Sequence, residues 1–406
     1  MLWISLVILL AVVVFMSMDS VIGAMYVSSD VTGEDTMVFT HYEMVQALRA
    51  DPANLNGRPL DTELMQEAMD AMGWVEQITI PADAVEDGQE YNVSVRQGGD
   101  MPATGDFMKD YAIRRSYMGV WDTVAAAVDE ENMNYDLTGE NFYAAWEDVR
   151  QNEYISGALT DGEINWWNRH NAALKTPVAW TAYAMGWENI SDAAYVVGLL
   201  TMLFAAIALA GVFPYERQQR MDTLSMCSKN GRGPLYLAKL LASLTVTFAG
   251  AVILFGTLIT STLAVMGTEG FDGMIPFFID FSYVGSLSIG QLALIACGLG
   301  LMAVLVHAAF TLALSLIYKG SIPTMATVFG VMLVSAVGNP FKGRFLNQLY
   351  SLFPSKLDGL AILDARLVNL FGHYLTSWQF APILWTLMLL ALAGAGWLLH
   401  RRVPNK

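Results

Sequence analysis

Residues 287–318, LSIGQLALIACGLGLMAVLVHAAFTLALSLIY, decide the fold class of this 406-residue chain. The stretch contains no Asp, Glu, Lys or Arg. A helix needs about 20 mainly apolar residues to cross the hydrocarbon core of a bilayer. This stretch is longer than that, so we expect a span that is tilted or that extends past the membrane interface. The stretch therefore predicts an α-helical integral membrane protein.

Five further apolar stretches extend the prediction to six transmembrane helices, at about residues 2–18, 193–213, 240–266, 322–338 and 382–399. The predicted organisation is a first transmembrane helix at 1–18, an acidic extracytoplasmic domain at 19–192, and helices two to six within 193–406. A cytoplasmic loop is expected at 214–239 and an external helical hairpin at 339–380.

Charge is divided unequally along the chain. The whole sequence has 22 Lys+Arg and 38 Asp+Glu, a formal charge of −16. Residues 19–192 hold 31 of the acids and 9 of the bases, a net of −22, whereas the rest holds 7 acids and 13 bases, a net of +6. This distribution excludes a uniform globular domain, a disordered chain and a nucleic-acid-binding protein, which needs a basic face. The acidic surface is either an attractive site for cationic ligands or a solvated exterior.

Basic residues in short loops indicate the cytoplasmic side of a membrane protein. They gather between spans two and three, at Lys319 after span four, and at Arg401 and Arg402 in the tail. We therefore expect both termini in the cytoplasm of a bacterial-type cytoplasmic membrane, with 19–192 outside. No basic residue precedes Leu2, which disfavours a cleaved signal peptide, and we expect a short cytoplasmic lead-in before the first span.

Periodicity predicts a mainly α external domain with a small β element. Apolar residues recur at helical spacing in 60–72, 107–128 and 140–150, and two short β-like pieces at 77–80 and 91–95 are compatible with a hairpin. Both cysteines, Cys227 and Cys297, lie outside this domain, so its own core must hold it together. Trp180, Tyr183 and Trp187 precede the second span, and we expect them at the membrane interface.

The loop after the second span is the most informative stretch for function. Residues 212–241 read VFPYERQQRMDTLSMCSKNGRGPLYLAKLL. Between Pro214 and Gly231, residues 216–226 can form about three helical turns along the cytoplasmic surface. The alternative interpretation is an ordinary basic loop, as the charge bias of any such membrane protein produces.

The same loop resembles the permease subunits of ATP-binding-cassette transporters of the type-2 exporter class. The matching pattern is an aromatic-Pro-x-Glu-Arg after span two, then Asp-Thr-Leu, Gly-Arg and Ala-Lys-Leu-Leu. The resemblance implies a coupling helix that docks on a separate ATPase. The residues it assigns to this coupling are Glu216, Arg217, Arg220, Asp222, Leu224, Gly231, Arg232 and Lys239.

The resemblance also implies the partners of the chain. These are cytoplasmic ATPase subunits that bind ATP and Mg²⁺, and a second permease, either an identical copy or a homologue. The six-span order, the insert after the first span and the external hairpin match the family. The chain departs from the family because it lacks the basic amphipathic helix expected before the first span.

Catalytic motifs are absent from the sequence. No G-x-x-x-x-G-K-[ST], H-E-x-x-H or G-x-S-x-G occurs, so we expect no enzyme activity and no cofactor in this chain. His307 is the one ionisable residue deep in a predicted span. It is either an intramembrane polar site or a neutral imidazole hydrogen-bonded to a neighbouring helix.

The predicted function is the permease subunit of an ATP-driven exporter. The alternative from another class is a membrane-anchored ligand-binding or sensory protein that acts through its extracytoplasmic domain without transport. An ATPase partner is expected only for the first, whereas the second requires cytoplasmic contacts with a signalling protein.

Overall fold

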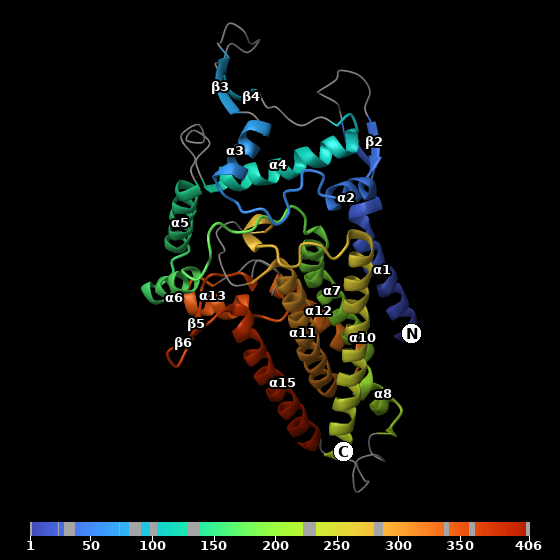
Figure 1. Cartoon of the computed structure of the whole chain (residues 1–406). Helices are drawn as coiled ribbons and strands as arrows, with labels where there is room; N and C mark the ends of the chain where they lie inside the picture. Colours follow the sequence, from blue (N-terminus) through green and yellow to red (C-terminus); the bar gives the residue numbers. More distant parts are fainter. Residues whose placement is uncertain are drawn as a thin grey trace. The chain divides into compact units, whose positions relative to one another are not determined.

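A computed structural model gives the structure of the chain (Figure 1). It describes residues 2–22, 24–27, 37–72, 74–80, 91–97, 104–127, 139–221, 233–279, 287–336, 341–356 and 362–402. The chain forms two compact units. Unit 1 comprises Met1–Asp19, Trp187–Val265 and Gln291–Lys406, and unit 2 comprises Ser20–Gly186 and Met266–Gly290. The chain therefore passes from one unit to the other at four places.

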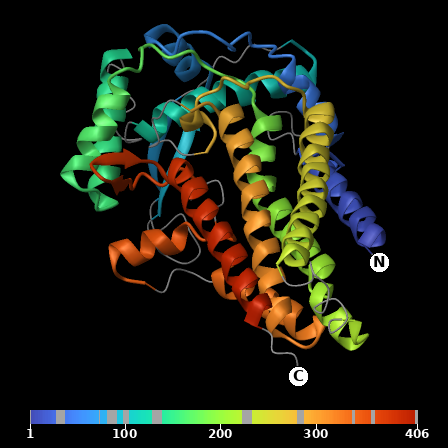
Figure 2. The same cartoon turned by 90° about the horizontal axis from the view of Figure 1, so that it is seen from below.

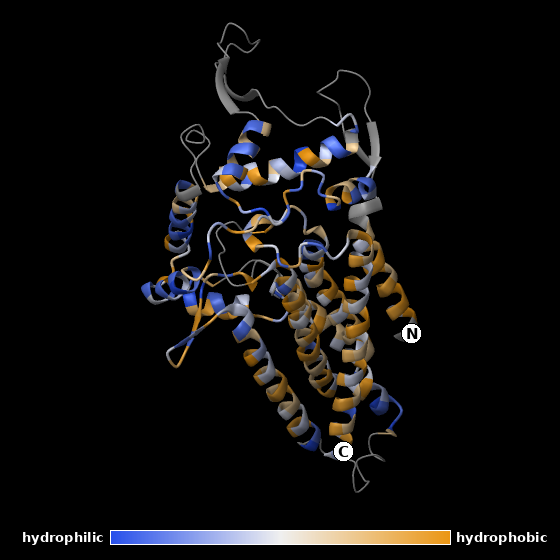
Figure 3. Ribbon diagram, viewed as in Figure 1, coloured by the Kyte–Doolittle hydropathy of each residue, from blue (hydrophilic) through white to orange (hydrophobic). Residues whose placement is uncertain are grey.

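Unit 1 is built mainly from helices. They are α1 (Leu2–Ile22), α7 (Met185–Leu209), α8 (Val212–Gln218), α10 (Pro234–Met266), α11 (Ile289–Ile317), α12 (Ser321–Ala336), α13 (Arg344–Ser351) and α15 (Ser377–Arg402). Among the described residues, four helical stretches are long and apolar enough to cross a membrane, namely Met185–Gln218, Pro234–Met266, Ile289–Ile317 and Ser377–Arg401. Figure 3 shows their long hydrophobic runs. The helical, apolar character expected from the sequence is confirmed for these four helices.

The other two predicted spans form shorter apolar stretches, Ile4–Met18 in α1 and Ser321–Ser335 in α12. With 16 residues, α12 is about 24 Å long, which is less than the hydrocarbon thickness of about 30 Å. In α1, the Ser17 hydroxyl donates a hydrogen bond to Ser261 Oγ of α10 at 2.7 Å. This bond joins the first helix of the chain to the rest of unit 1.

Close packing joins α7, α10 and α11, which run side by side in Figures 1 and 2. A Cβ built on Gly250 of α10 would lie 2.8 Å from the Phe204 ring of α7. A Cβ built on Gly300 of α11 would lie 2.4 Å from the Phe255 ring of α10. Glycine at both positions admits a bulky ring, as small residues do at membrane-helix contacts.

Between α12 and α15 the structure differs from the predicted external helical hairpin at 339–380. α13 fits the first half of it, but the second half holds two antiparallel strands, β5 (Val368–Leu370) and β6 (His373–Leu375). The two turn residues between them have positive φ angles, 52° at Phe371 and 91° at Gly372. Such angles at both positions are typical of a tight hairpin turn, and Gly372 adopts its angle without a Cβ penalty.

Unit 2 combines five α-helices and one short 3₁₀ helix, η3 (Ile275–Phe277), with two strand pairs in its described part. The helices are α2 (His41–Arg49), α3 (Thr62–Met72), α4 (Phe107–Ala127), α5 (Gly139–Ser156) and α6 (Asp161–Asn171). The antiparallel pairs are β1 (Ala24–Val27) with β2 (Met37–Thr40), and β3 (Trp74–Ile80) with β4 (Tyr91–Gln97). The helices predicted at 60–72, 107–128 and 140–150 and the β3–β4 hairpin are confirmed in this part. α2, α6 and the β1–β2 pair were not predicted from the sequence.

The core of unit 2 lies among α3, α4 and α5. Its fully buried side chains include Leu64, Val120 and Phe142. Trp180, 3% exposed, belongs to this core, and its ring centre lies 4.6 Å from that of Phe277 in the segment after α10. The expectation that Trp180 is an interfacial anchor is therefore wrong, because its indole packs inside unit 2.

Candidate functional site

The loop that carries the sequence resemblance begins with α8. Gly211 precedes this helix, and Pro214 occupies its first turn, where a missing backbone N–H removes no helical hydrogen bond. Phe213 and Pro214 are buried, whereas Tyr215 is 63% exposed. One face of this short helix therefore packs against the rest of unit 1, and the opposite face is exposed.

An ion pair ties α8 to α10. The Lys239 ammonium group donates to the Glu216 carboxylate, and the two side chains are only 15% and 30% exposed. The same ammonium nitrogen lies 4.5 Å from the centre of the Phe213 ring, within the range of a cation–π contact. Because the pair is partly removed from water, its attraction is screened less than that of a surface pair.

A second charged side chain ties α8 to α11. The Arg217 guanidinium donates to the carbonyl oxygens of Leu316 and Tyr318, the latter at 3.2 Å. α11 ends at Ile317, so these carbonyls are among the last of a helix, which have no partner within it. A cation at this end is also favoured by the helix dipole.

An aromatic cluster extends the connection to α15. The Phe213 ring centre lies 6.2 Å from that of Tyr236 and 5.5 Å from that of His400. The Tyr236 hydroxyl donates to the Ala393 carbonyl at 3.2 Å. A Cβ at Gly396 would lie 2.1 Å from the Tyr236 hydroxyl oxygen, so the residue at this position must be small.

We call this group the α8 junction: Phe213, Glu216, Arg217, Tyr236, Lys239 and His400. It joins α8, α10, α11 and α15 through one ion pair, three backbone-directed hydrogen bonds and a set of ring contacts. The junction thus connects the ends of four helices.

The structure brings together three of the residues assigned by the resemblance, Glu216, Arg217 and Lys239. Arg220 is exposed and adopts a φ of 55°. Together with Gln219 it forms a turn, so the helix expected at 216–226 is interrupted there: α8 starts earlier, at Val212, and ends at Gln218. Four assigned residues lie outside the described part of the chain: Asp222, Leu224, Gly231 and Arg232.

His307 lies apart from the junction, in the middle of α11. Its side chain is 3% exposed, and Nδ1 lies 3.1 Å from the carbonyl oxygen of Ala303 in the same helix. A carbonyl only accepts, so this contact requires that Nδ1 carry the proton. The imidazole ring also meets Phe353 edge to face, with 6.4 Å between centres. The hydrogen bond thus returns to its own helix and not to a neighbour.

Two junction residues had no role in the sequence analysis. Tyr236 carries no charge and lies in the predicted loop at 214–239, before the predicted span at about 240–266. His400 lies 187 positions after Phe213 along the chain (400 − 213). The sequence signal that could have identified them is that each is a polar aromatic residue beside an apolar stretch. The polar atom of such a ring usually makes a hydrogen bond when it is buried.

Within the described residues no group of three or more His, Cys, Asp or Glu side chains is placed to hold a metal ion. Comparison of the chain with protein-family models, curated proteins and solved structures finds no match.

Proposed function

We propose that the chain is the membrane-spanning subunit of an ATP-driven exporter, coupled through the α8 junction to a separate cytoplasmic ATPase. The observation that carries this proposal is the α8 junction itself. A short helix with an exposed face, fixed at its base to three long helices, is suited to receive a push from a protein partner. The loop motif and the resemblance to type-2 permeases support an ATPase as that partner.

Chain connectivity supports the proposed orientation. The chain enters unit 2 from the C-terminal ends of α1 and α10, and returns to unit 1 at the N-terminal ends of α7 and α11. Since unit 2 is one compact body, these four helix ends belong on one side of the membrane. The basic residues Arg217, Lys239, Lys319 and Arg401 are at the opposite ends, which the charge bias assigns to the cytoplasm.

This arrangement supports six spans, with α1 and α12 as the shorter two, and an extracytoplasmic unit 2. Both termini are then cytoplasmic, and the membrane is a bacterial-type cytoplasmic membrane. The functional assembly contains two permeases, identical or homologous, and two ATPase subunits that hold ATP and Mg²⁺. No step of ATP hydrolysis is assigned to a residue of this chain.

The mechanism follows from the contacts of the junction. When the ATPase subunits close, they displace α8. Glu216 transmits the displacement to α10 through Lys239, and Arg217 transmits it to the end of α11. Because α7 continues into α8 within a single turn, α7 moves as well. The tilt of these helices changes access to the interface between the two permeases.

The test uses the full-length chain in lipid nanodiscs with a candidate ATPase subunit from the same genome. Glu216→Lys and Lys239→Glu break the ion pair, and the double variant restores it with reversed polarity. We expect both single variants to lose stimulation of the ATPase. If Glu216 also contacts the ATPase, the double variant regains thermal stability but not stimulation.

A matched control is the ion pair of Arg366 with Asp364, in which the closest atoms are 2.6 Å apart. It lies in unit 1 but outside the junction, and its charge reversal should leave ATPase stimulation unchanged. Equal loss in this control, or no ATPase stimulation by the wild type, contradicts the proposal. Binding of an external ligand without any ATPase partner would support the sensory alternative.

A further inference from the structure

The short helix α13, between α12 and α15, exposes its apolar side. Phe345, Leu346 and Leu349 are 74%, 50% and 40% exposed, and no residue of this helix is buried. In a protein surrounded by water, an amphipathic helix turns its apolar side toward the core. The opposite orientation indicates that this side of α13 meets an apolar medium outside the chain.

The polar side of α13 is bonded to the chain. Asn347 Oδ1 accepts a hydrogen bond from Arg366 Nη1 at 2.8 Å, and Asn347 Nδ2 donates to the Phe341 carbonyl at 3.1 Å. Gln348 Nε2 donates to the Arg366 carbonyl at 3.4 Å. These bonds hold the polar side against the chain and leave the apolar side directed outward.

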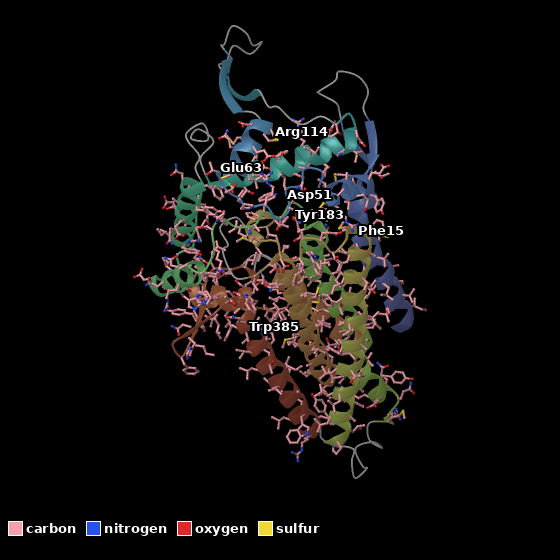
Figure 4. All side chains as sticks on the ribbon, in the orientation of Figure 1. Phe15, Asp51, Glu63, Arg114, Tyr183 and Trp385 are labelled. Atoms are coloured by element: carbon pink, nitrogen blue, oxygen red, sulfur yellow. The ribbon has the colours of Figure 1, made fainter. Side chains whose placement is uncertain are left out.

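Two further hydrogen bonds join the α13 segment to the flanking helices. The Tyr350 hydroxyl donates to the Val334 carbonyl of α12 at 3.0 Å. Trp385 of α15, labelled in Figure 4, is 0% exposed, and its Nε1 donates to the Leu352 carbonyl at 2.8 Å. Val334 lies near the C-terminal end of α12, and its own side chain is 69% exposed. In the proposed topology this is the end at which α12 leaves the outer leaflet of the membrane.

The β5–β6 hairpin presents a further apolar residue, Phe371, at its turn. The Phe371 side chain is 97% exposed, and its φ of 52° is a conformation that a bulky residue rarely adopts. Asn, Asp or Gly is the usual residue at such a turn position. Only Thr376 separates β6 from α15, and Figures 1 and 2 show the hairpin beside the start of that helix. The fold itself therefore gains nothing from the apolar ring of Phe371.

The charge of this segment favours lipid as the medium that covers it. Residues 341–356 contain Lys342, Arg344 and Lys356 but no Asp or Glu. By contrast, residues 19–192, on the same side of the membrane in the proposed topology, have a net charge of −22. Basic residues beside an apolar helix face are typical of helices that lie on the surface of anionic bilayers.

We propose that α13 and the β5–β6 hairpin bind the outer leaflet of the bilayer. Their exposed apolar side chains enter the hydrocarbon, and the basic side chains of residues 341–356 bind the phosphate groups of anionic lipids. The proposal rests on the proposed topology of α12 and α15 but not on coupling to an ATPase. Its experiments contain no ATPase and no nucleotide, so its failure is distinguishable from failure of the proposed function.

The first experiment measures the surroundings of the two apolar sites in the full-length chain, reconstituted in vesicles of phosphatidylcholine and phosphatidylglycerol. Phe345→Cys and Phe371→Cys, each in a background without the two native cysteines, carry an environment-sensitive fluorophore. Leu390→Cys, at a 63% exposed position of α15, is the reference for lipid contact. Arg114→Cys, at an exposed position of α4, is the reference for water. We expect lipids with brominated acyl chains to quench both test sites several-fold more than the Arg114 site.

The quenching pattern distinguishes three environments. Strong quenching by brominated lipid and weak quenching by aqueous iodide, as at the Leu390 site, supports the proposal. Strong quenching by iodide, as at the Arg114 site, overturns it, because the test sites then face water. Protection from both quenchers also overturns it, because a second copy of the chain or another protein then covers these side chains.

The second experiment tests the basic residues. The preference for anionic lipid is the ratio of quenching by brominated phosphatidylglycerol to quenching by brominated phosphatidylcholine at the Phe345→Cys site. Lys342→Gln removes an exposed cation and should lower this preference about fivefold, the effect of one basic residue near an anionic surface. Lys109→Gln, at an exposed lysine of α4, is the control and should leave the preference unchanged. If both variants keep the same preference, the basic residues do not bind lipid phosphates and the proposal is wrong.

Discussion

The guanidinium group of Arg49 donates two hydrogen bonds to the carboxylate of Glu269, from Nε at 3.2 Å and from Nη2 at 2.7 Å. The two residues are 220 positions apart, one at the end of α2 and the other in the segment that follows α10. The Tyr183 hydroxyl adds a hydrogen bond of 2.7 Å to the Met266 carbonyl. The connection between α10 and α11 is therefore an integral part of unit 2.

This ion pair predicts a pH dependence of stability. The hydrogen bonds from Arg49 hold the pKa of the Glu269 carboxyl below its ordinary value of 4.5. A carboxyl with a lowered pKa in the folded state stabilises the fold above its unfolded pKa, and the contribution is lost as pH falls through the folded pKa. Since Glu269 is 45% exposed, we expect Glu269→Gln to lower the free energy of unfolding by about 0.2–1 kcal/mol at pH 7. The difference from the wild type should vanish in acid.

Thermal unfolding at pH 7 and below pH 4 provides the measurement. Asp272→Asn serves as the control, because it removes an exposed carboxylate of the same segment. If Glu269→Gln is less stable than the wild type by the same amount at both pH values, the charge of the Glu269 carboxylate does not account for its contribution to stability.

Tyr117 provides a second prediction within unit 2. Its hydroxyl donates to the Glu67 carboxylate, which also pairs with Arg58 at 2.7 Å. Burial, with the contribution of Glu67, raises the pKa of Tyr117 to about 12, so the hydroxyl stays a donor at neutral pH. Tyr117→Phe should cost about 1 kcal/mol at pH 7. The cost should shrink as pH falls through the pKa of Glu67, which the Arg58 hydrogen bond lowers.

The comparison variant is Tyr143→Phe. The Tyr143 hydroxyl donates to the Leu60 carbonyl at 2.8 Å and accepts from the Val178 N–H at 2.9 Å. Both partners are backbone groups that do not titrate, so the cost of this variant should be the same in acid and at neutral pH. The two tyrosines thus separate the loss of a hydrogen bond from the loss of a carboxylate contact.

Helices with a strong pattern were predictable from the sequence. α11 follows from a stretch without charges, and α4 follows from apolar residues at helical spacing. The β5–β6 hairpin was not predictable in this way, because Leu363, Leu367 and Leu370 also fit helical spacing. The turn at Phe371 and Gly372 decided the structure there, and its signal is local backbone chemistry that a periodicity argument ignores.

The candidate site was predictable only in part, for a different reason. Charge bias and the loop motif identified Glu216, Arg217 and Lys239. The partners of Arg217 are backbone carbonyls about 100 positions away, at Leu316 and Tyr318. A carbonyl has no residue-specific signal, so only the packing of α8 against the end of α11 reveals this contact.

Arg217 gives a prediction for the α8 junction. Arg217→Gln removes a cationic donor from the end of α11 and should lower the free energy of unfolding by about 1.5–3 kcal/mol. Arg217→Lys keeps the charge but loses the forked geometry, so its effect should be intermediate. Thermal unfolding of the purified chain in detergent is the measurement.

Arg114→Gln is the matched control for this prediction. Arg114 is an exposed arginine of α4, and an exposed substitution is expected to change the free energy of unfolding by about 0.5 kcal/mol or less. If both substitutions lower the free energy of unfolding equally, the hydrogen bonds from Arg217 to the carbonyls at the end of α11 do not account for its contribution.

Two neighbouring glycines of α11 should respond in opposite directions to the same substitution. A Cβ at Gly300 would lie 2.4 Å from the Phe255 ring, whereas a Cβ at Gly298 would meet nothing within 4 Å. Gly300→Ala should therefore destabilise the chain by about 1–3 kcal/mol through overpacking. Gly298→Ala should stabilise it by about 0.5–1 kcal/mol, because alanine loses less conformational freedom in a helix. Phe255→Leu should relieve this overpacking, so the double variant should lose less stability than the sum of the two single changes. If the two losses simply add, contact with the Phe255 ring is not the cause of the destabilisation by Gly300→Ala.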